Sequence, residues 1–228
     1  MIYRSNLTAP DFQPYFKHTI SQVRPHSQGH DVLYDFQDKA DDDPVFGVYK
    51  RCGFFTHDEA AILYNIARQV GGGSWLDIGG LTGWTAAHLS KAGCSVTSVD
   101  PMYTNLDFLT RTTDNLREAG CAVGLVGCTS NLFFADDPDR FDGIVIDGDH
   151  ESPRPLQDAI NAAERTTPDG VIVLHDMIFP GPQEAWMYLN NKGWKTHGYK
   201  TPHRLTVCWR GGSVFVPPYH VPDPGVHV

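Results

Sequence analysis

Short apolar runs alternate with amphipathic stretches from residue 56 to residue 210, and this alternation predicts the fold. Nearly all-apolar runs such as Ile144-Val145-Ile146 and Val171-Ile172-Val173-Leu174 are typical of central strands in a parallel sheet covered on both faces. The expected strands span residues 74–78, 95–99, 122–127, 141–147, 171–175, 194–199 and 205–210, and the expected helices span 83–92, 104–119, 153–166 and 182–192. We therefore expect a doubly wound α/β fold with a mostly parallel, seven-stranded sheet. Its last two strands, separated by a turn around Thr201-Pro202, are expected to form an antiparallel hairpin.

Another helix is expected before the first strand. Thr56-His57-Asp58-Glu59 has the form of a capping box, in which the side chains of Thr56 and Glu59 each accept the backbone N–H of the other. Apolar residues then recur on one helical face, and Gly71-Gly72-Gly73 ends the helix.

The ends of the chain differ in composition from its centre. Residues 1–44 are polar and irregular and are expected to form an N-terminal arm or lid, residues 45–210 the main domain, and residues 211–228 an extended proline-rich tail. The arm carries Tyr15 and Phe16, which would let it close over a substrate as a lid. The alternatives are a dimer contact and a disordered arm, and a homodimer is a further expectation.

Charge and composition narrow the class of partner. The 228 residues include 18 Lys and Arg against 27 Asp and Glu, for a net charge of -9. Because a protein that grips the nucleic-acid backbone needs a basic face, the balance favours a small molecule over nucleic acid. The five cysteines form no CxxC pair, which indicates core positions in a reducing compartment. Since we find neither a signal-peptide pattern nor the run of about 18 apolar residues that a membrane span needs, we expect a cytoplasmic protein without a membrane partner.

A glycine-rich turn follows the first strand of the main domain. Gly79 lets the backbone turn tightly after Asp77, and Gly83 lets the next helix approach the strand. The free N–H groups at the start of that helix can bind an anion. About 20 residues further on, Asp100 ends the second strand, where its carboxylate can accept both hydrogen bonds of a ribose diol.

The residues within this turn distinguish between cofactors. Leu81 stands where a dinucleotide fingerprint has its second glycine, and its side chain would crowd a pyrophosphate. An amino-acid carboxylate is smaller and would fit, with the Thr85 hydroxyl as an additional donor.

The segment Asp77-Ile78-Gly79-Gly80-Leu81-Thr82-Gly83-Trp84-Thr85 resembles a motif of the class I S-adenosylmethionine (SAM)-dependent methyltransferases. Its acidic-x-Gly-x-x-x-Gly-aromatic-Ser/Thr form is similar to that of the metal-dependent O-methyltransferases of catechols, caffeoyl esters and macrolide sugars. The resemblance covers roughly residues 45–210 and departs from the motif at Gly80 and Leu81-Thr82. It implies a Rossmann-like fold, SAM as the cofactor, and O-methylation of a hydroxyl on a small molecule such as a sugar or natural product. The SAM-binding residues it implies are Asp77, Gly79, Gly83, Trp84, Thr85, Asp100, Met102, Thr129 and Asp147.

Ionisable residues follow two apolar strands of the expected sheet. They are Asp147, Asp149, His150, His175 and Asp176. Because the carboxyl ends of parallel strands meet at one edge of a sheet, we expect these residues to converge beside the cofactor. Such a cluster is costly unless its members are solvated, paired or bound to an ion, and it therefore indicates a functional site.

The resemblance places the ligands of a divalent metal at Asp147, His175 and Asp176. Sugar-modifying members of that branch typically have carboxylates at these places, so His175 is a departure. A mixed carboxylate-imidazole set would suit manganese, iron or zinc as well as magnesium. Alternatively, His175 is a base and no metal binds.

O-methylation also needs a group that removes the hydroxyl proton. His150 stands three residues after Asp147, where catechol-type relatives carry a catalytic lysine, and a histidine can serve as this base near neutral pH. Asp149 matches the base proposed for the sugar-modifying relatives. Both remain candidate catalytic residues, and the structural alternative for His150 is a cap on the next helix.

Two other functions remain open. The first alternative is a SAM-binding regulatory protein without catalysis, and the many ionisable residues at the strand ends argue against it. The second is a nucleotide-dependent oxidoreductase on a similar fold, and Leu81 argues against it.

Overall fold

The structure, a computed structural model, describes residues 7, 9–12, 14–17, 19–20, 36–37, 53–201 and 203–211. The strands of the main sheet are β3 (Ser74–Ile78), β4 (Ser95–Val99), β5 (Val123–Val126), β6 (Phe141–Ile146), β7 (Thr166–Leu174), β8 (Lys195–Gly198) and β9 (Thr206–Trp209). The helices are α1 (His57–Val70), α2 (Trp84–Lys91), α3 (Leu106–Glu118), α4 (Ser130–Asp136), α5 (Arg154–Arg165) and α6 (Pro180–Asn191), with the 3-10 helix η1 (Pro101–Thr104). β1 (Thr19–Ile20) and β2 (Phe36–Gln37) form a separate antiparallel pair.

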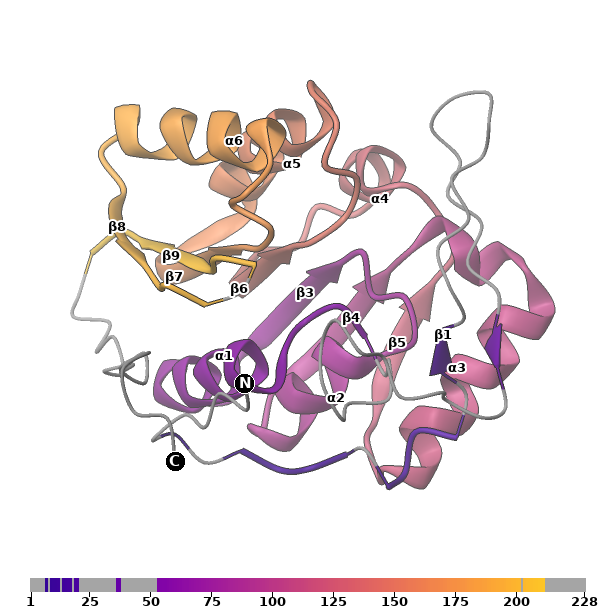
Figure 1. Cartoon of the computed structure of the whole chain (residues 1–228). Coiled ribbons are helices and arrows are strands. Elements are labelled where there is room, and N and C mark those ends of the chain that lie inside the picture. The colour runs from indigo at the N-terminus through magenta and orange to yellow at the C-terminus, as the bar shows by residue number, and fades with distance from the viewer. Residues whose placement is uncertain are drawn as a thin grey trace.

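The main sheet has seven strands in the order β5-β4-β3-β6-β7-β9-β8 (Figure 1). The pairs from β5 to β7 are parallel, and β9 runs antiparallel to both β7 and β8. The chain builds outward from β3 to β5 and then returns to start again at β6, so the topological switch point lies between β3 and β6. The expected doubly wound sheet with a C-terminal hairpin is confirmed.

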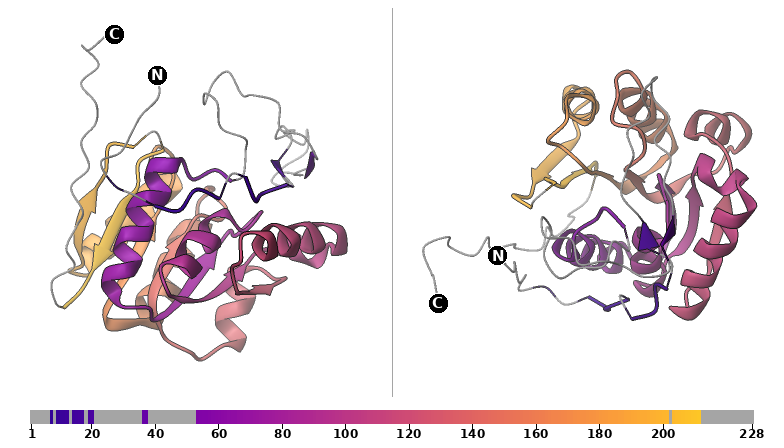
Figure 2. Two further views of the ribbon diagram at one scale, coloured as in Figure 1. Left: turned by 90° about the horizontal axis from the view of Figure 1, so that it is seen from below. Right: turned by 45° about the vertical axis from the view of Figure 1, so that its right-hand side comes forward.

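Side chains of the central strands alternate between the two faces of the sheet. Val145 and Val173 pack in the cluster that includes α1 and α2, whereas Ile144 and Ile172 pack in the cluster that includes α4, α5 and α6. An extended strand imposes this period of two. Both faces are apolar because helices cover both, as Figure 2 shows from two further directions.

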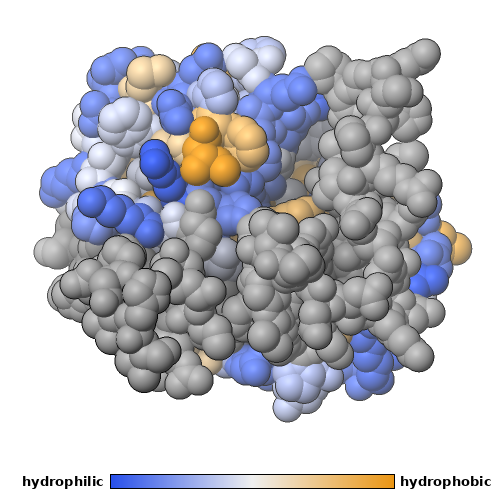
Figure 3. All heavy atoms as spheres, in the orientation of Figure 1, coloured by the Kyte–Doolittle hydropathy of each residue, from blue (hydrophilic) through white to orange (hydrophobic). Residues whose placement is uncertain are grey.

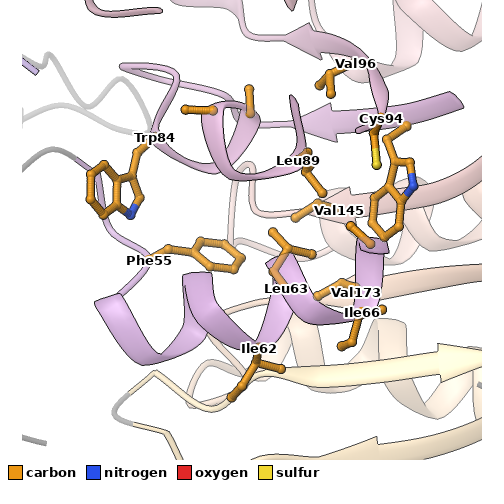
Figure 4. Close-up of a cluster of buried hydrophobic side chains, with 14 of the residues drawn as sticks. Phe55, Ile62, Leu63, Ile66, Trp84, Leu89, Cys94, Val96, Val145 and Val173 are labelled. Carbon is orange, nitrogen blue, oxygen red and sulfur yellow. The ribbon is translucent and has the colours of Figure 1, made fainter. Parts of the chain in front are cut away.

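Helix α1 begins at the predicted capping box and packs its apolar stripe on the sheet. Thr56 Oγ1 accepts the Glu59 N–H at 3.3 Å, and Glu59 Oε2 accepts the Thr56 N–H at 2.9 Å. Figure 4 shows Leu63 of this helix beside Val145 of β6 and Ile66 beside Val173 of β7, and all four side chains are fully buried. Burying one such side chain stabilises the fold by about 1.5–3 kcal/mol, so the packing of α1 holds Glu59 firmly in place.

β7 begins at Thr166, earlier than the residue 171 that the apolar pattern predicts. Pro168 and Gly170 lie in this first part of the strand, and both residue types disfavour a strand in a sequence pattern. The strand tolerates them because its register against β6 shifts between Phe141 and Gly143.

Two helices between β4 and β6 also differ from expectation. The helix expected over residues 104–119 is α3, which begins only at Leu106 because Asn105 is its N-cap: Asn105 Oδ1 accepts the N–H groups of Asp107 and Phe108 at 3.0 and 3.2 Å. Helix α4 was not expected, because its seven residues are too few to show a helical period.

Part of the N-terminal segment packs against α2. Phe12 and Phe16 are buried and meet the ring of Trp84 edge-on, with centroid distances of 6.3 and 5.4 Å. Most of residues 1–44 and nearly all of residues 211–228 lie outside the described residues, so the division into arm, domain and tail stays a prediction, as does the lid.

The cysteines that the structure describes carry free thiols. Cys94 and Cys208 are buried, Cys121 and Cys128 are partly buried, and Cys52 lies outside the described residues. In the part of the chain that the structure describes, no helix is long and apolar enough to cross a membrane.

A close contact at the centre of the sheet predicts a stability effect. A Cβ atom at Gly143 would lie 2.3 Å from the indole ring of the fully buried Trp75. We expect Gly143→Ala to destabilise the protein by about 1–3 kcal/mol, because the overpacked indole has to shift. Gly124→Ala in β5 is the matched control, since its Cβ would have Val96 O as its nearest neighbour at 3.6 Å. Equal melting temperatures for the two variants in differential scanning fluorimetry would contradict this account.

Candidate functional site

The loop between β3 and α2 is folded tightly against its neighbours. Gly79 has a φ of 87°, and a Cβ atom there would lie 2.2 Å from the carbonyl oxygen of Asp147. A Cβ atom at Gly80 would lie 1.7 Å from Ser98 Oγ. Only glycine fits at these two positions, and the first of them brings the loop into direct contact with the residue that follows β6.

Asp77 lies at the base of this loop as a fully buried carboxylate. Its Oδ2 accepts a hydrogen bond from Ser98 Oγ at 2.9 Å, but its Oδ1 has no hydrogen-bond partner among the described residues. Burial raises the pKa of Asp77 to about 7, and the negative charges of Asp147 and Asp100 add to the effect of burial. A buried oxygen without a donor is costly and indicates a place for a ligand that brings one.

Asp100 ties the loop to the start of η1. Its Oδ2 accepts the Leu81 N–H at 2.9 Å, and its Oδ1 accepts the Met102 N–H at 2.8 Å. These bonds hold Leu81 at a φ of 44°, a left-handed conformation that a branched side chain rarely adopts. Each carboxylate oxygen keeps a second lone pair, so the expected ribose contact and this structural role are compatible.

The amino end of α2 faces the loop. Gly83 is its N-cap with a φ of 86°, and no side chain caps the helix, so the first N–H groups stay available for an anion. Thr85 is buried in the first turn. The Trp84 side chain points away from this role, because its ring packs against Phe12 and Phe16, so only its backbone can take part as expected.

Met102 and Thr129, two of the implied SAM-binding residues, lie in the loops that follow the paired strands β4 and β5. A Cβ atom at Gly127 would lie 2.9 Å from the backbone nitrogen of Thr104, so the loop after β5 packs on η1, which contains Met102. Thr129 lies in the same loop and caps α4, with its Oγ1 3.4 Å from the Leu132 nitrogen.

The ends of β6 and β7 bring four of the expected ionisable residues together. The strands are paired in register up to Ile146 and Leu174, so the residues that follow them are neighbours. His175 Nδ1 lies 2.7 Å from Asp147 Oδ1, and His150 Nε2 lies 3.1 Å from Asp176 Oδ2. His150 Nε2 is also 3.7 Å from Asp147 Oδ1. Four of the five residues expected to converge are therefore in contact in the structure.

His175 occupies the most enclosed position in this cluster. Its side chain has no exposed surface, and the Phe55 ring stacks on it at 4.0 Å. Its second nitrogen, Nε2, lies 3.2 Å from Glu59 Oε2. Burial alone would lower the pKa of His175, but the charge and hydrogen bonds of Asp147, Asp176 and Glu59 outweigh it and raise that pKa well above its usual value.

Sequence reasoning missed two residues of the cluster, Glu59 and His203. Glu59 Oε1 accepts the backbone N–H of His203 at 3.1 Å, and His203 Nδ1 lies 2.7 Å from Asp176 Oδ1. Burial would raise the pKa of Glu59, but the hydrogen bond and charge of His175 lower it to about 2. In the sequence, the capping box was a sufficient reason for a glutamate at position 59, so no role in the site was expected for it. The only signal for His203 was its place beside the predicted hairpin turn.

Asp149, the second candidate base, lies outside this cluster. Its Oδ2 forms an ion pair with Arg154 Nη1 at 2.5 Å, and its Oδ1 accepts the Glu151 N–H at 2.8 Å. His150 does not cap the next helix, since α5 starts after Pro153 without a side-chain cap.

The cluster contains two groups of three residues whose potential metal-ligating atoms lie within 4.8 Å of one another. One group is His175, Asp176 and His203, and the other is Asp147, His150 and Asp176. The three ligands implied by the resemblance are adjacent but do not form either group.

The family comparison agrees with the geometry of the loop and the strand ends. The model of a family described as a methyltransferase domain matches residues 76–177, which run from β3 through the carboxyl end of β7. No match was found among curated protein sequences.

Solved structures with the same fold include several methyltransferases. An O-methyltransferase from Bacillus cereus in complex with SAH is 14% identical, with a TM-score of 0.58 over 68% of this chain and 82% of that one. TomG, an O-methyltransferase from Streptomyces achromogenes in complex with SAM, is 19% identical, with a TM-score of 0.55 over 69% and 82%. A precorrin-6y C5,15-methyltransferase from Geobacter metallireducens is 17% identical, with a TM-score of 0.57 over 76% and 95%.

At these identities the structural likeness shows the fold, which this chain shares with O-methyltransferases solved with SAM or SAH. The match to the methyltransferase-domain model covers residues 76–177, the part of the chain that contains the loop and the strand ends.

Proposed function

We propose that this protein transfers the methyl group of SAM to a hydroxyl oxygen of a small molecule. One observation carries the proposal: Gly79 of the cofactor loop abuts the backbone of Asp147, so His150 and the carboxylates around it lie beside the loop. Cofactor binding and acid-base chemistry thus meet at the switch point of the sheet, where ligands of such folds bind.

The residues of the loop fit SAM. The unpartnered Asp77 Oδ1 suits the ammonium group of the methionine part, and the uncapped amino end of α2 suits its carboxylate. Asp100 keeps lone pairs for the ribose hydroxyls. When bound, SAM supplies a methyl group on a positively charged sulfur, which an oxygen nucleophile attacks in line.

His150 is the base that the geometry favours. Its Nε2 lies 3.1 Å from Asp176 Oδ2 and 3.7 Å from Asp147 Oδ1, and with the ring proton on Nε2 the lone pair of Nδ1 would take the hydroxyl proton. Burial would lower the pKa of His150, but its interaction with Asp147 and the charge of Asp176 raise it, which makes the ring a stronger base. Its side chain is 33% exposed, so an acceptor can reach it.

The surroundings of His150 favour an acceptor with an apolar part. The Phe179 ring stacks on the imidazole at 5.1 Å and is itself 42% exposed, and the neighbouring Ile178 is 44% exposed. Figure 3 shows an apolar patch with hydrophilic surroundings on the face that Figure 1 presents, near α6. Apolar surface beside a polar reactive group is typical of small-molecule sites.

Structural neighbours with this fold carry names of both oxygen and carbon methyltransferases, so the fold does not select the acceptor atom. A hydroxyl must lose its proton to become a good nucleophile, and a histidine beside the loop meets that need. An oxidoreductase is disfavoured because Leu81, whose side chain packs with Tyr103 and Phe108, stands where a dinucleotide fingerprint has its second glycine.

The metal set implied by the resemblance does not fit the geometry. A metal ligand must offer a lone pair, and both ring nitrogens of His175 face carboxylate oxygens. No step of the proposed mechanism therefore passes through a metal ion.

The first test concerns Asp100 and the cofactor. We expect Asp100→Ala to weaken SAH binding in calorimetry by at least tenfold, because the variant loses the ribose contact and the two hydrogen bonds that shape the loop. Asp107→Ala on the exposed side of α3 is the control and should bind SAH normally. Equal affinity in both variants would remove Asp100 from the cofactor site.

The second test uses the raised pKa of Asp77. The folded protein holds this proton up to about pH 7, whereas the unfolded chain releases it near 3.8, so the ionisation of Asp77 lowers stability as the pH rises between these values. We expect Asp77→Asn to melt at a higher temperature than the wild type at pH 8, with a smaller difference at pH 5, and to bind SAM more weakly. If the difference in melting temperature between Asp77→Asn and the wild type does not change with pH, the raised pKa of Asp77 is contradicted.

The third test separates the two candidate bases. We expect His150→Gln to lower kcat by about 100-fold or more with SAM affinity unchanged, and Asp149→Asn to lower it by less than about threefold, since Asp149 is engaged by Arg154. In the wild type, the acidic limb of the pH-rate profile should lie above the usual histidine pKa, because His150 must lose its proton to act. A larger loss in Asp149→Asn than in His150→Gln would reverse the assignment.

A further inference from the structure

The charge arrangement around His175 differs from that of a metal site. Nδ1 lies 2.7 Å from Asp147 Oδ1 and Nε2 lies 3.2 Å from Glu59 Oε2, so each ring nitrogen faces a carboxylate oxygen. A nitrogen lone pair would repel such an oxygen, whereas an N–H donates to it. The two contacts therefore favour a proton on both nitrogens, which makes the ring a cation.

Complete burial makes this cation part of the framework. The side chains of His175 and Glu59 have no exposed surface, and Phe55 stacks on the imidazole at 4.0 Å and 15°. A buried charge is tolerated only when it is paired and hydrogen-bonded, and His175 satisfies both conditions through two carboxylates from different parts of the chain.

Hydrogen bonds other than the contact with His175 fix the Glu59 side chain in place. Its Oε2 accepts the N–H and hydroxyl of Thr56 at the start of α1, and its Oε1 accepts the N–H of His203. The capping box thus presents an immobile negative charge to the end of β7, and Glu59 acts as a positioning residue for the imidazole.

The carboxylates of the cluster are engaged by imidazole side chains. The carboxylates of Glu59, Asp147 and Asp176 contact the imidazoles of His150, His175 and His203. Asp147 Oδ1 and Asp176 Oδ1 each already lie 2.7 Å from a ring nitrogen. The carboxylate oxygens that a divalent ion would need are therefore already engaged by imidazole nitrogens.

We propose that the His175 imidazolium, positioned by Glu59, is the resident cation of this site and takes the place of a divalent metal. It orients Asp147 beside the cofactor loop, and Asp147 in turn faces His150. The inference rests on the proposed function only in assuming that methyl transfer takes place at this cluster.

Manganese binding tests the proposal directly, because Mn²⁺ is visible by electron paramagnetic resonance and calorimetry. We expect chelator-treated wild-type protein, with and without SAH, to bind no stoichiometric Mn²⁺. We expect His175→Asp, which replaces the cation by a carboxylate, to bind about one Mn²⁺ per chain. His197→Asp makes the same substitution at an exposed position of β8 and should not gain an ion.

Each other result overturns the proposal. One Mn²⁺ bound to the wild type with micromolar affinity would show that the site takes a metal beside His175. Failure of a folded His175→Asp variant to bind Mn²⁺ would show that the His175 imidazolium does not substitute for a metal ion at this position. Calorimetry with SAH on the same samples tests the cofactor separately: loss of SAH binding would contradict the proposed function and leave the assignment of His175 untouched.

A measurement on the wild type covers the case in which His175→Asp does not fold. In protein labelled with ¹⁵N-histidine, the His175 ring is identified by its contacts with the Phe55 ring. At pH 8 we expect both of its nitrogens to carry a proton. A neutral ring with one unprotonated nitrogen would overturn the proposal.

Discussion

The parallel pairing of β3, β6 and β7 is the constraint on which the site depends. It places the cofactor loop, Asp147 and His175 at one edge of the sheet, because each follows the carboxyl end of its strand. The spacing leaves no room for a side chain at Gly79, so the loop and the end of β6 are in contact. Apolar residues on both faces of these strands bury the sheet and make the arrangement rigid.

Buried charge is the second constraint, and buried carboxylates are stabilised differently on the two sides of the contact between the cofactor loop and the end of β6. On the cofactor side, Asp77 is a buried acid with one oxygen unpaired, and burial raises its pKa to about 7. On the chemistry side, Glu59 is equally buried but is paired with His175, which lowers its pKa to about 2. A positively charged ligand therefore gains more binding free energy beside the unpaired Asp77 than beside Glu59, whose charge is already paired with His175.

Local patterns were sufficient to predict the sheet, the capping box and the convergence of Asp147, His150, His175 and Asp176. These features depend on the period of apolar residues and on the rule that parallel strands end together. The roles of Glu59 and His203 were not predictable, because their contacts join residues 144 apart in the chain and involve no shared motif. The engagement of Asp149 by Arg154 was missed for a similar reason, since a strand-end carboxylate has the same sequence signature whether it faces the site or the next helix.

His175 stands where the resemblance to the sugar-modifying relatives implies a carboxylate, and this difference changes how the charges of the site are offset. A carboxylate at the end of β7 would stand next to Asp147, Asp176 and Glu59, and their mutual repulsion would need an external cation to offset it. An imidazole at the same place offsets the repulsion itself, provided that an acid holds each nitrogen. Glu59 meets the second half of that requirement from α1, and it can do so only because the capping box directs its side chain back toward Thr56 and the end of β7. The helix cap and the charge balance of the site are therefore one structural feature, and a change to either residue of the Glu59–His175 pair alters both.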